Sequence, residues 1–143
     1  MTIRAEQFSV LLVEDDDVAA EAVVRGLHKH GMDCPIVIAE DGAIALQILR
    51  GTHSARQISK PFLVLMDLNM PRMSGIEFLQ ELRADDTLHN AVVFVLTTSG
   101  ADADRARAYG QNIAGYMVKS GVGPQCRGLA KFLTEYQSAV LLP

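Results

Sequence analysis

The chain has 143 residues, 49% hydrophobic and 21% charged, which suits one packed domain and leaves little room for a second. Its formal net charge is -4, and its longest basic grouping is Arg105 and Arg107, so nucleic-acid binding is not expected. No apolar run approaches the ~20 residues of a membrane span, and the N-terminus lacks a secretory pattern. We therefore expect a cytoplasmic protein with neither a membrane nor a nucleic-acid partner.

Short apolar segments recur along the chain between longer amphipathic ones. In chain order, the predicted strands are residues 8–13, 36–39, 62–66, 91–96 and the weaker 114–118. Their Val, Leu, Ile and Phe side chains do not alternate with polar ones. This pattern is typical of strands that are buried on both faces of a parallel sheet.

A helical pattern follows each predicted strand. The predicted helices are centred on residues 20–27, 41–51, 76–82, 101–109 and 129–136. Gly31 and Gly51 are expected to end the first two helices, and Asp41 to cap the second. The fourth has a weak apolar face, and Asp102 and Asp104 place negative charge at its start.

Strand and helix thus alternate five times, which requires right-handed crossovers and a parallel sheet. The sequence predicts a flavodoxin-like (βα)5 doubly wound α/β fold with strand order 2-1-3-4-5. We expect one domain over residues 1–143, with 1–7 as an N-terminal extension and 139–143 as a C-terminal tail. Ligands of such sheets bind beyond the carboxyl ends of the strands, near the first and third.

Polar residues follow four of the strands at that edge. Glu14 and Asp15 follow the first, Asp67 the third, Thr97 the fourth and Lys119 the fifth. Three crowded carboxylates favour an intervening cation, and oxygen ligands suit Mg²⁺. A carboxylate can also attack phosphorus, provided that the phosphoryl oxygens are neutralised. Asp67 is the best nucleophile candidate because it is central.

Four sequence blocks at these strand ends resemble those of response-regulator receiver domains of the CheY-like type. They are Leu-Leu-Val-Glu-Asp-Asp (11–16), Met-Asp-Leu-Asn-Met-Pro (66–71), Leu-Thr-Thr-Ser (96–99) and Gly-Tyr-Met-Val-Lys (115–119). Within that family the chain most resembles the single-domain regulators of phytochrome-type sensor histidine kinases. The cues are Tyr109 with Asn112, the long 51–61 loop and the C-terminal Leu-Leu-Pro.

The resemblance implies that Asp67 accepts a phosphoryl group from a sensor histidine kinase such as a bacteriophytochrome. Glu14, Asp15, Asp67 and the main chain of Asn69 would hold Mg²⁺. Such a protein catalyses its own phosphorylation and slow dephosphorylation, and it is a signalling switch rather than an enzyme.

The remaining site residues match other roles in this family. Thr97 corresponds to the hydroxyl that moves toward the phosphoryl group, and Tyr116 to the aromatic residue that turns inward with it. Lys119 corresponds to the lysine that pairs with phosphoryl oxygens. Asn69 and Ser99 flank the path of the attacking water, so the resemblance assigns them to tuning dephosphorylation.

One position departs from the family pattern. Receiver domains usually follow this lysine with a proline in a cis peptide, whereas Ser120 and Gly121 follow Lys119 here. A cis bond before a non-proline residue costs ~2.5–4 kcal/mol. The 119–124 loop therefore takes another path, or it keeps the cis bond at that cost.

The C-terminal helix indicates a surface through which the domain could bind a partner. Its apolar residues at 129, 133, 136 and 140 are followed by Leu141 and Leu142, which is more than a core-packing helix should need. No effector domain is expected to follow. We expect output by protein binding, and a homodimer through this helix, as in relatives of the subfamily.

Three rival functions differ from this one in the residues that they require. A phosphorylation-silent receiver would act only as a docking module, which the Lys119–Ser120 departure keeps open. A haloacid-dehalogenase-like phosphatase would need an aspartate where Asn69 stands, and a cap insertion. A nucleotide- or flavin-binding module would need glycines where residues 14–17 are acidic.

Overall fold

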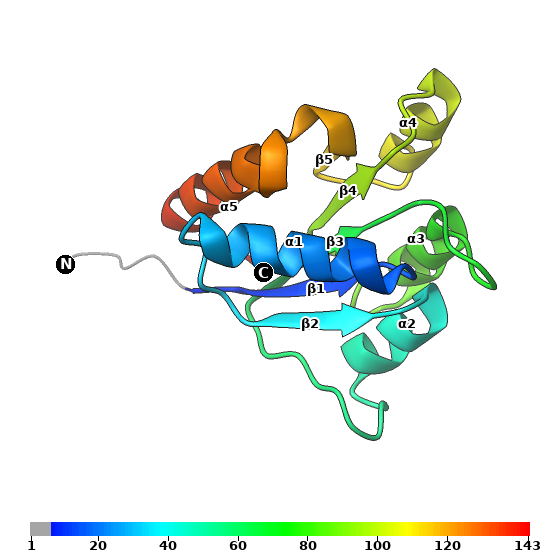
Figure 1. Cartoon of the computed structure of the whole chain (residues 1–143). Coiled ribbons are helices and arrows are strands. Elements are labelled where there is room, and N and C mark those ends of the chain that lie inside the picture. Colours follow the sequence, from blue (N-terminus) through cyan, green and yellow to red (C-terminus); the bar gives the residue numbers. More distant parts are fainter. Residues whose placement is uncertain (1–6) are drawn as a thin grey trace.

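The apolar segments form one parallel sheet in the order β2-β1-β3-β4-β5, as predicted (Figure 1). The computed structural model describes residues 7–143, so the extension expected at 1–7 lies outside the described residues except for Gln7. The strands are β1 (Ser9–Val13), β2 (Ile36–Ala39), β3 (Phe62–Met66), β4 (Val93–Thr97) and β5 (Gly115–Val118). This is the predicted flavodoxin-like (βα)5 fold.

The predicted helices are present, and local side chains explain their ends. They are α1 (Asp17–Lys29), α2 (Gly42–Arg50), α3 (Gly75–Ala84), α4 (Asp102–Tyr109) and α5 (Arg127–Ala139). Asp16 caps α1 by accepting from two main-chain N–H groups, and Asp41 and Ser74 cap α2 and α3. Gly51 ends α2 with a φ of 73°, a left-handed conformation that glycine adopts without strain.

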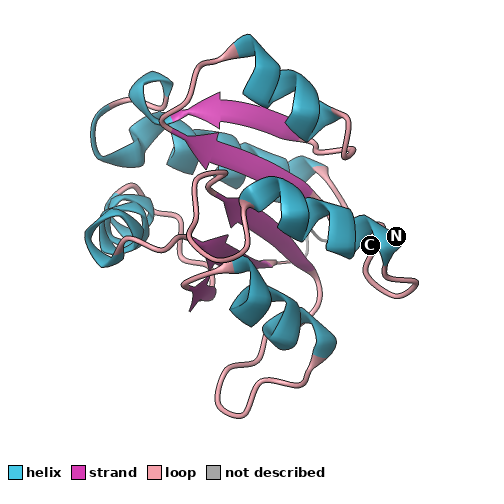
Figure 2. Cartoon of the chain, turned by 90° about the vertical axis from the view of Figure 1, so that its right-hand side faces the viewer, coloured by secondary structure: helices cyan, strands magenta, loops and turns pink. Residues whose placement is uncertain are grey.

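Helices cover both faces of the sheet (Figure 2). Leu11 and Val13 of β1 pack in one apolar core with α2, α3 and α4, whereas Val10 and Leu12 pack in the other with α1 and α5. Burial on both sides explains why the central strands are apolar throughout. The prediction is wrong for the edge strands, because β5 and most of β2 are half-buried.

β4 begins and ends later than the apolar run suggests. Ala91 lies in a turn, where its N–H donates to the carbonyl of Leu88, and the strand starts at Val93. The strand then includes Thr97, which pairs with Val118 of β5 and is fully buried. The main chain of Thr97 is therefore held by the sheet itself.

The segment after β5 shows which of the two expected paths the chain takes after Lys119. Within residues 7–143 the cis peptide is Lys60–Pro61, so the Lys119–Ser120 peptide is trans and the loop takes another path. It forms two short 3-10 turns, Lys119–Gly121 and Pro124–Cys126, before α5. A side chain at Gly26 of α1 would lie 2.3 Å from the carbonyl oxygen of Gln125, so this path needs glycine there.

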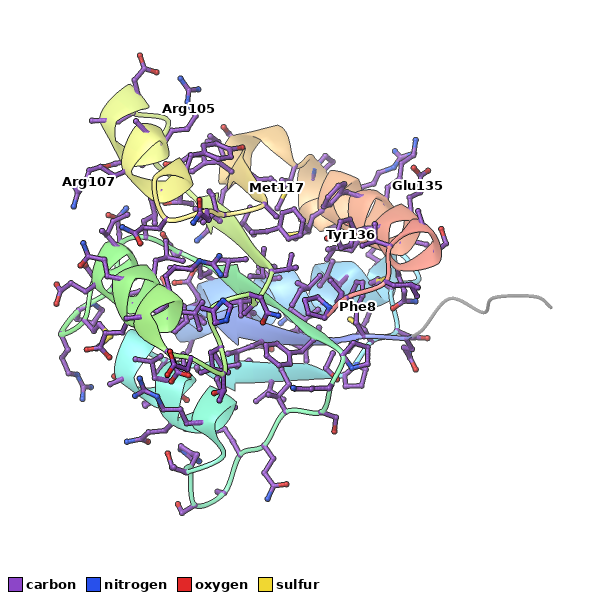
Figure 3. The ribbon with its side chains drawn as sticks, turned by 180° about the vertical axis from the view of Figure 1, so that it is seen from behind. Phe8, Arg105, Arg107, Met117, Glu135 and Tyr136 are labelled. Atoms are coloured by element: carbon purple, nitrogen blue, oxygen red, sulfur yellow. The ribbon has the colours of Figure 1, made fainter. Side chains whose placement is uncertain are left out.

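The end of the chain returns to the start of the sheet. The ring of Tyr136 in α5 lies 6.4 Å from that of Phe8 (Figure 3). Leu142 packs against the same core, so part of the tail completes the core instead of forming a free patch. Phe132 and Leu141 are exposed. None of the helices in the described part of the chain combines the length and apolarity needed to cross a bilayer.

Candidate functional site

Three buried polar side chains lie at the carboxyl ends of neighbouring strands. Glu14, Asp67 and Thr97 are 5%, 8% and 0% exposed. Strand register brings the two acids level, because Val13 pairs with Met66 and each acid is the next residue. Polar groups in such a position cost free energy unless they are hydrogen-bonded or paired, so their partners indicate what this edge of the sheet is built to do.

Lys119 is the charged partner of both acids. Its Nζ lies 2.7 Å from Glu14 Oε1 and 3.3 Å from Asp67 Oδ2. The lysine reaches them because it follows β5, whose last residue pairs with Thr97. The structure thus brings together Glu14, Asp67, Thr97 and Lys119, as the sequence predicted.

The two oxygens of Asp67 have different surroundings. Oδ1 accepts hydrogen bonds from Thr97 Oγ1 at 2.9 Å and from the N–H of Asn69 at 3.1 Å. Oδ2 has the longer contact with Lys119. Oδ1 therefore accepts two hydrogen bonds, whereas Oδ2 has one contact and keeps a lone pair free for a new bond.

Burial and charge act in opposite directions on the ion pair. Burial raises the pKa of Glu14, and its bond to Lys119 offsets this only in part. Burial lowers the pKa of Lys119, but the hydrogen bond and charge of Glu14, with those of Asp67, outweigh it and raise that pKa. The lysine is therefore positively charged at neutral pH.

The predicted metal ligands are only partly assembled. Asp15 and Asn69 are exposed at the ends of β1 and β3. Across residues 7–143, no three His, Cys, Asp or Glu side chains are grouped closely enough to hold a metal ion, so Asp15 does not complete a cluster with Glu14 and Asp67. The site still suits a hard cation, because its donor atoms are oxygens. One lysine also faces two buried carboxylates, so a second positive charge would balance the site.

Tyr116 and Ser99 lie next to this site. The hydroxyl of half-buried Tyr116 donates to the main-chain carbonyl of Ser99 at 2.8 Å. The resemblance implies that phosphorylation brings Thr97 toward the phosphoryl group and turns Tyr116 inward, and this structure has both a Thr97–Asp67 contact and an inward Tyr116. Ser99 also donates to Asp104 of α4 at 2.5 Å. Sequence pattern indicates Asp104 only as negative charge at a helix start, so it does not reveal this contact.

Comparison with known proteins agrees with the fold and the site. The family model described as "Response regulator receiver domain" matches residues 10–125. The probable methanogenesis regulatory protein FilR2 of Methanothrix harundinacea is 36% identical over 114 residues, which is 80% of this chain and 73% of that protein.

Two solved structures have the same fold over almost their whole length. The phosphorylated cyanobacterial phytochrome response regulator RcpA matches with a TM-score of 0.80 and 29% identity, over 96% of this chain and 99% of that one. The Mn²⁺-bound form of response regulator Rcp1 also has a TM-score of 0.80, with 28% identity over 95% and 99%.

The family match covers most of the chain, and the structural matches extend over all five strands. Their agreement excludes a chance likeness in a single motif. The chain belongs to the response-regulator receiver family of two-component signalling systems, and its close relatives there include the single-domain phytochrome response regulators RcpA and Rcp1.

Proposed function

We propose that this protein accepts a phosphoryl group on Asp67 from a sensor histidine kinase and signals by a change in protein binding. The observation that carries the proposal is the buried Asp67, which accepts from Thr97 and faces the ammonium of Lys119. We further propose that residues 1–143 work as one receiver domain in the cytoplasm, with 1–7 and 139–143 as extension and tail.

The transfer step requires a free oxygen and a neutralised phosphoryl group. Asp67 Oδ2 uses one lone pair to form the O–P bond while the P–N bond to the donor histidine breaks, and the electron pair stays on the histidine nitrogen. Lys119 already contacts that oxygen and would pair with the phosphoryl oxygens. The Thr97 hydroxyl and the N–H of Asn69 would turn to the same oxygens, since both now donate to Asp67.

Mg²⁺ is the proposed metal, held by Asp15, Asp67 and the main chain of Asn69, with Glu14 in support. A bound divalent cation would neutralise phosphoryl oxygens and lessen the repulsion between the carboxylates. Support comes from the oxygen donors at this sheet edge and from the relative Rcp1, which has a Mn²⁺-bound form.

Phosphorylation would alter the surface around α4. The added charge of ~-1.5 to -2 competes for the Thr97 hydroxyl, and Thr97 and Tyr116 would transmit the change as switch residues. α4 is a suitable moving element because Ala108 is its one buried residue. Asn69 and Ser99 would tune hydrolysis of the acyl phosphate, so the protein returns slowly to its starting state without acting as an enzyme on other substrates.

The proposed partners are a phytochrome-type kinase and a second copy of the chain. The similarity to RcpA supports the kinase class. The exposed Phe132 and Leu141 on α5 and its tail support a homodimer through that region. Sedimentation at high concentration, with and without acetyl phosphate, should detect a dimer. A monomer under both conditions would remove this part of the proposal.

The test of the phosphoacceptor is labelling by acetyl phosphate, followed by intact mass with and without Mg²⁺. We expect the wild type to gain one phosphoryl group when Mg²⁺ is present, and Asp67→Asn to gain none. Asp102→Asn is the matched control, since it neutralises an exposed acid on α4 and should label normally. A wild type that never labels would favour a silent docking domain, and an Asp67→Asn variant that still labels would place the acceptor elsewhere.

A further inference from the structure

The start of α4 lacks the usual capping side chain. Ala101 occupies the N-cap position and has no side chain that can accept a hydrogen bond from the helix. Ser99 and Asp104 connect the preceding loop to this helix start in another way. The Ser99 hydroxyl accepts from the N–H of Ala101 at 3.3 Å and donates to Asp104 Oδ2 at 2.5 Å. The carboxylate therefore fixes Ser99 to the first turn of the helix.

Ser99 also contacts both switch residues. Its N–H points at Thr97 Oγ1 at 3.4 Å, and its carbonyl accepts from Tyr116 at 2.8 Å. Because a donor occupies one side of the Thr97 oxygen, the hydroxyl proton is directed to the other side, where Asp67 Oδ1 lies at 2.9 Å. A continuous chain of contacts thus runs from Asp104 on α4 to the proposed phosphoacceptor.

Few buried side chains hold α4 in place, so this chain of contacts can determine where the helix begins. α4 buries one residue, Ala108, and Arg105 and Arg107 project from it toward solvent (Figure 3). A bond from a hydroxyl to a carboxylate is stronger than a neutral one. The position of the 98–101 loop therefore depends strongly on the Ser99–Asp104 contact.

We infer that Asp104 is a positioning residue for phosphoryl transfer: through Ser99 it holds the Thr97 hydroxyl toward Asp67, ready to donate to an incoming phosphoryl oxygen. This inference rests on the proposed function of Asp67 and adds to it a residue that touches neither phosphoryl group nor metal. It gives α4 a direct effect on the chemistry, so a partner that displaces Asp104 from Ser99 would also weaken phosphoryl binding.

The test is the affinity for beryllium fluoride with Mg²⁺, a phosphoryl analogue, followed by the NMR signals of Thr97 and Tyr116. Asp104→Ala should bind about two- to tenfold more weakly, the range spanned by one hydrogen bond. Asp104→Asn keeps an acceptor oxygen and should stay within about twofold of the wild type. Asp102→Ala removes the neighbouring charge at the same helix start and should bind like the wild type.

A double-mutant cycle separates positioning from simple destabilisation. Ser99→Ala should lose as much affinity as Asp104→Ala, and the double variant no more than either, because all three break the same contact. Unchanged affinity in Asp104→Ala, an equal loss in Asp102→Ala, or losses that multiply in the double variant would overturn the inference. Failure of the wild type to bind the analogue would instead overturn the function proposed for Asp67.

Discussion

Replacing Lys119 by alanine should destabilise the protein in a manner that depends on pH. The change removes the ammonium that faces Glu14 at 2.7 Å and Asp67 at 3.3 Å. Removing one partner of a fully buried ion pair costs ~3–5 kcal/mol, and an exposed pair is worth ~0–1 kcal/mol. The side chain of Lys119 is 27% exposed and that of Glu14 is 5% exposed, so we expect a loss of about 1–3 kcal/mol at pH 7.5.

The direction of the pH effect follows from the two pKa shifts. The pKa of Lys119 is raised above its ordinary value of 10.5. The contribution of Lys119 to the free energy of unfolding is therefore fully present below pH 10.5 and is lost as the pH rises through the raised pKa. Without the lysine, the pKa of Glu14 loses its largest lowering influence and rises further above 4.5. Protonated Glu14 needs no cation, so the difference between variant and wild type should shrink as the pH falls toward 5.

The assay is urea unfolding followed by circular dichroism, with EDTA, at pH 7.5 and pH 5. Lys131→Ala is the control, since Lys131 is exposed on α5 and should change stability by less than about 0.5 kcal/mol. Saturating Mg²⁺ should restore part of the stability of Lys119→Ala. This variant should also retain some labelling by acetyl phosphate with a blunted response. Equal stability of Lys119→Ala and wild type at pH 7.5, or a difference that widens at pH 5, would refute the electrostatic reasoning.

Two further predictions concern the scaffold. Gly26→Ala should lower the free energy of unfolding by about 1–3 kcal/mol, because its Cβ would meet the Gln125 carbonyl oxygen, whereas Gly100→Ala, with open space around it, should be nearly neutral in urea unfolding. Asp85 accepts hydrogen bonds from Thr87 and Arg50, which lower its pKa from 3.8 to about 2. The contribution of Asp85 to the free energy of unfolding is therefore present above pH 3.8 and is lost as the pH falls toward 2. Asp85→Asn should therefore be less stable than the wild type at pH 6 and approach it in acid; a difference independent of pH would contradict that account.

The topology could be predicted because it depends on which side chains avoid water. Apolar runs of four to six residues predicted the five strands, and the alternation with helices predicted a parallel sheet. Once the strand order is known, the residues after β1, β3 and β5 must meet at one edge. Glu14, Asp67 and Lys119 could therefore be placed together without any knowledge of the loops.

Contacts that depend on loop geometry could not be predicted. Ser120 in place of the family's proline left two paths open after Lys119, and the trans peptide with its 3-10 turn decides between them. The hydrogen bond between Ser99 and Asp104 depends on where α4 begins, which patterns locate poorly. Nor does spacing indicate that Arg83 donates to four main-chain carbonyls around the start of β4 and the end of α4.

Chemical mapping of the phosphorylated residue tests the central claim most directly. After exposure to acetyl phosphate and Mg²⁺, borohydride reduces an aspartyl phosphate to the corresponding alcohol, and peptide mass spectrometry then locates it. We expect this conversion at Asp67, with none at the neighbouring acids Glu14 and Asp15. Conversion at either of those acids, or a phosphoryl group that resists borohydride altogether, would contradict it.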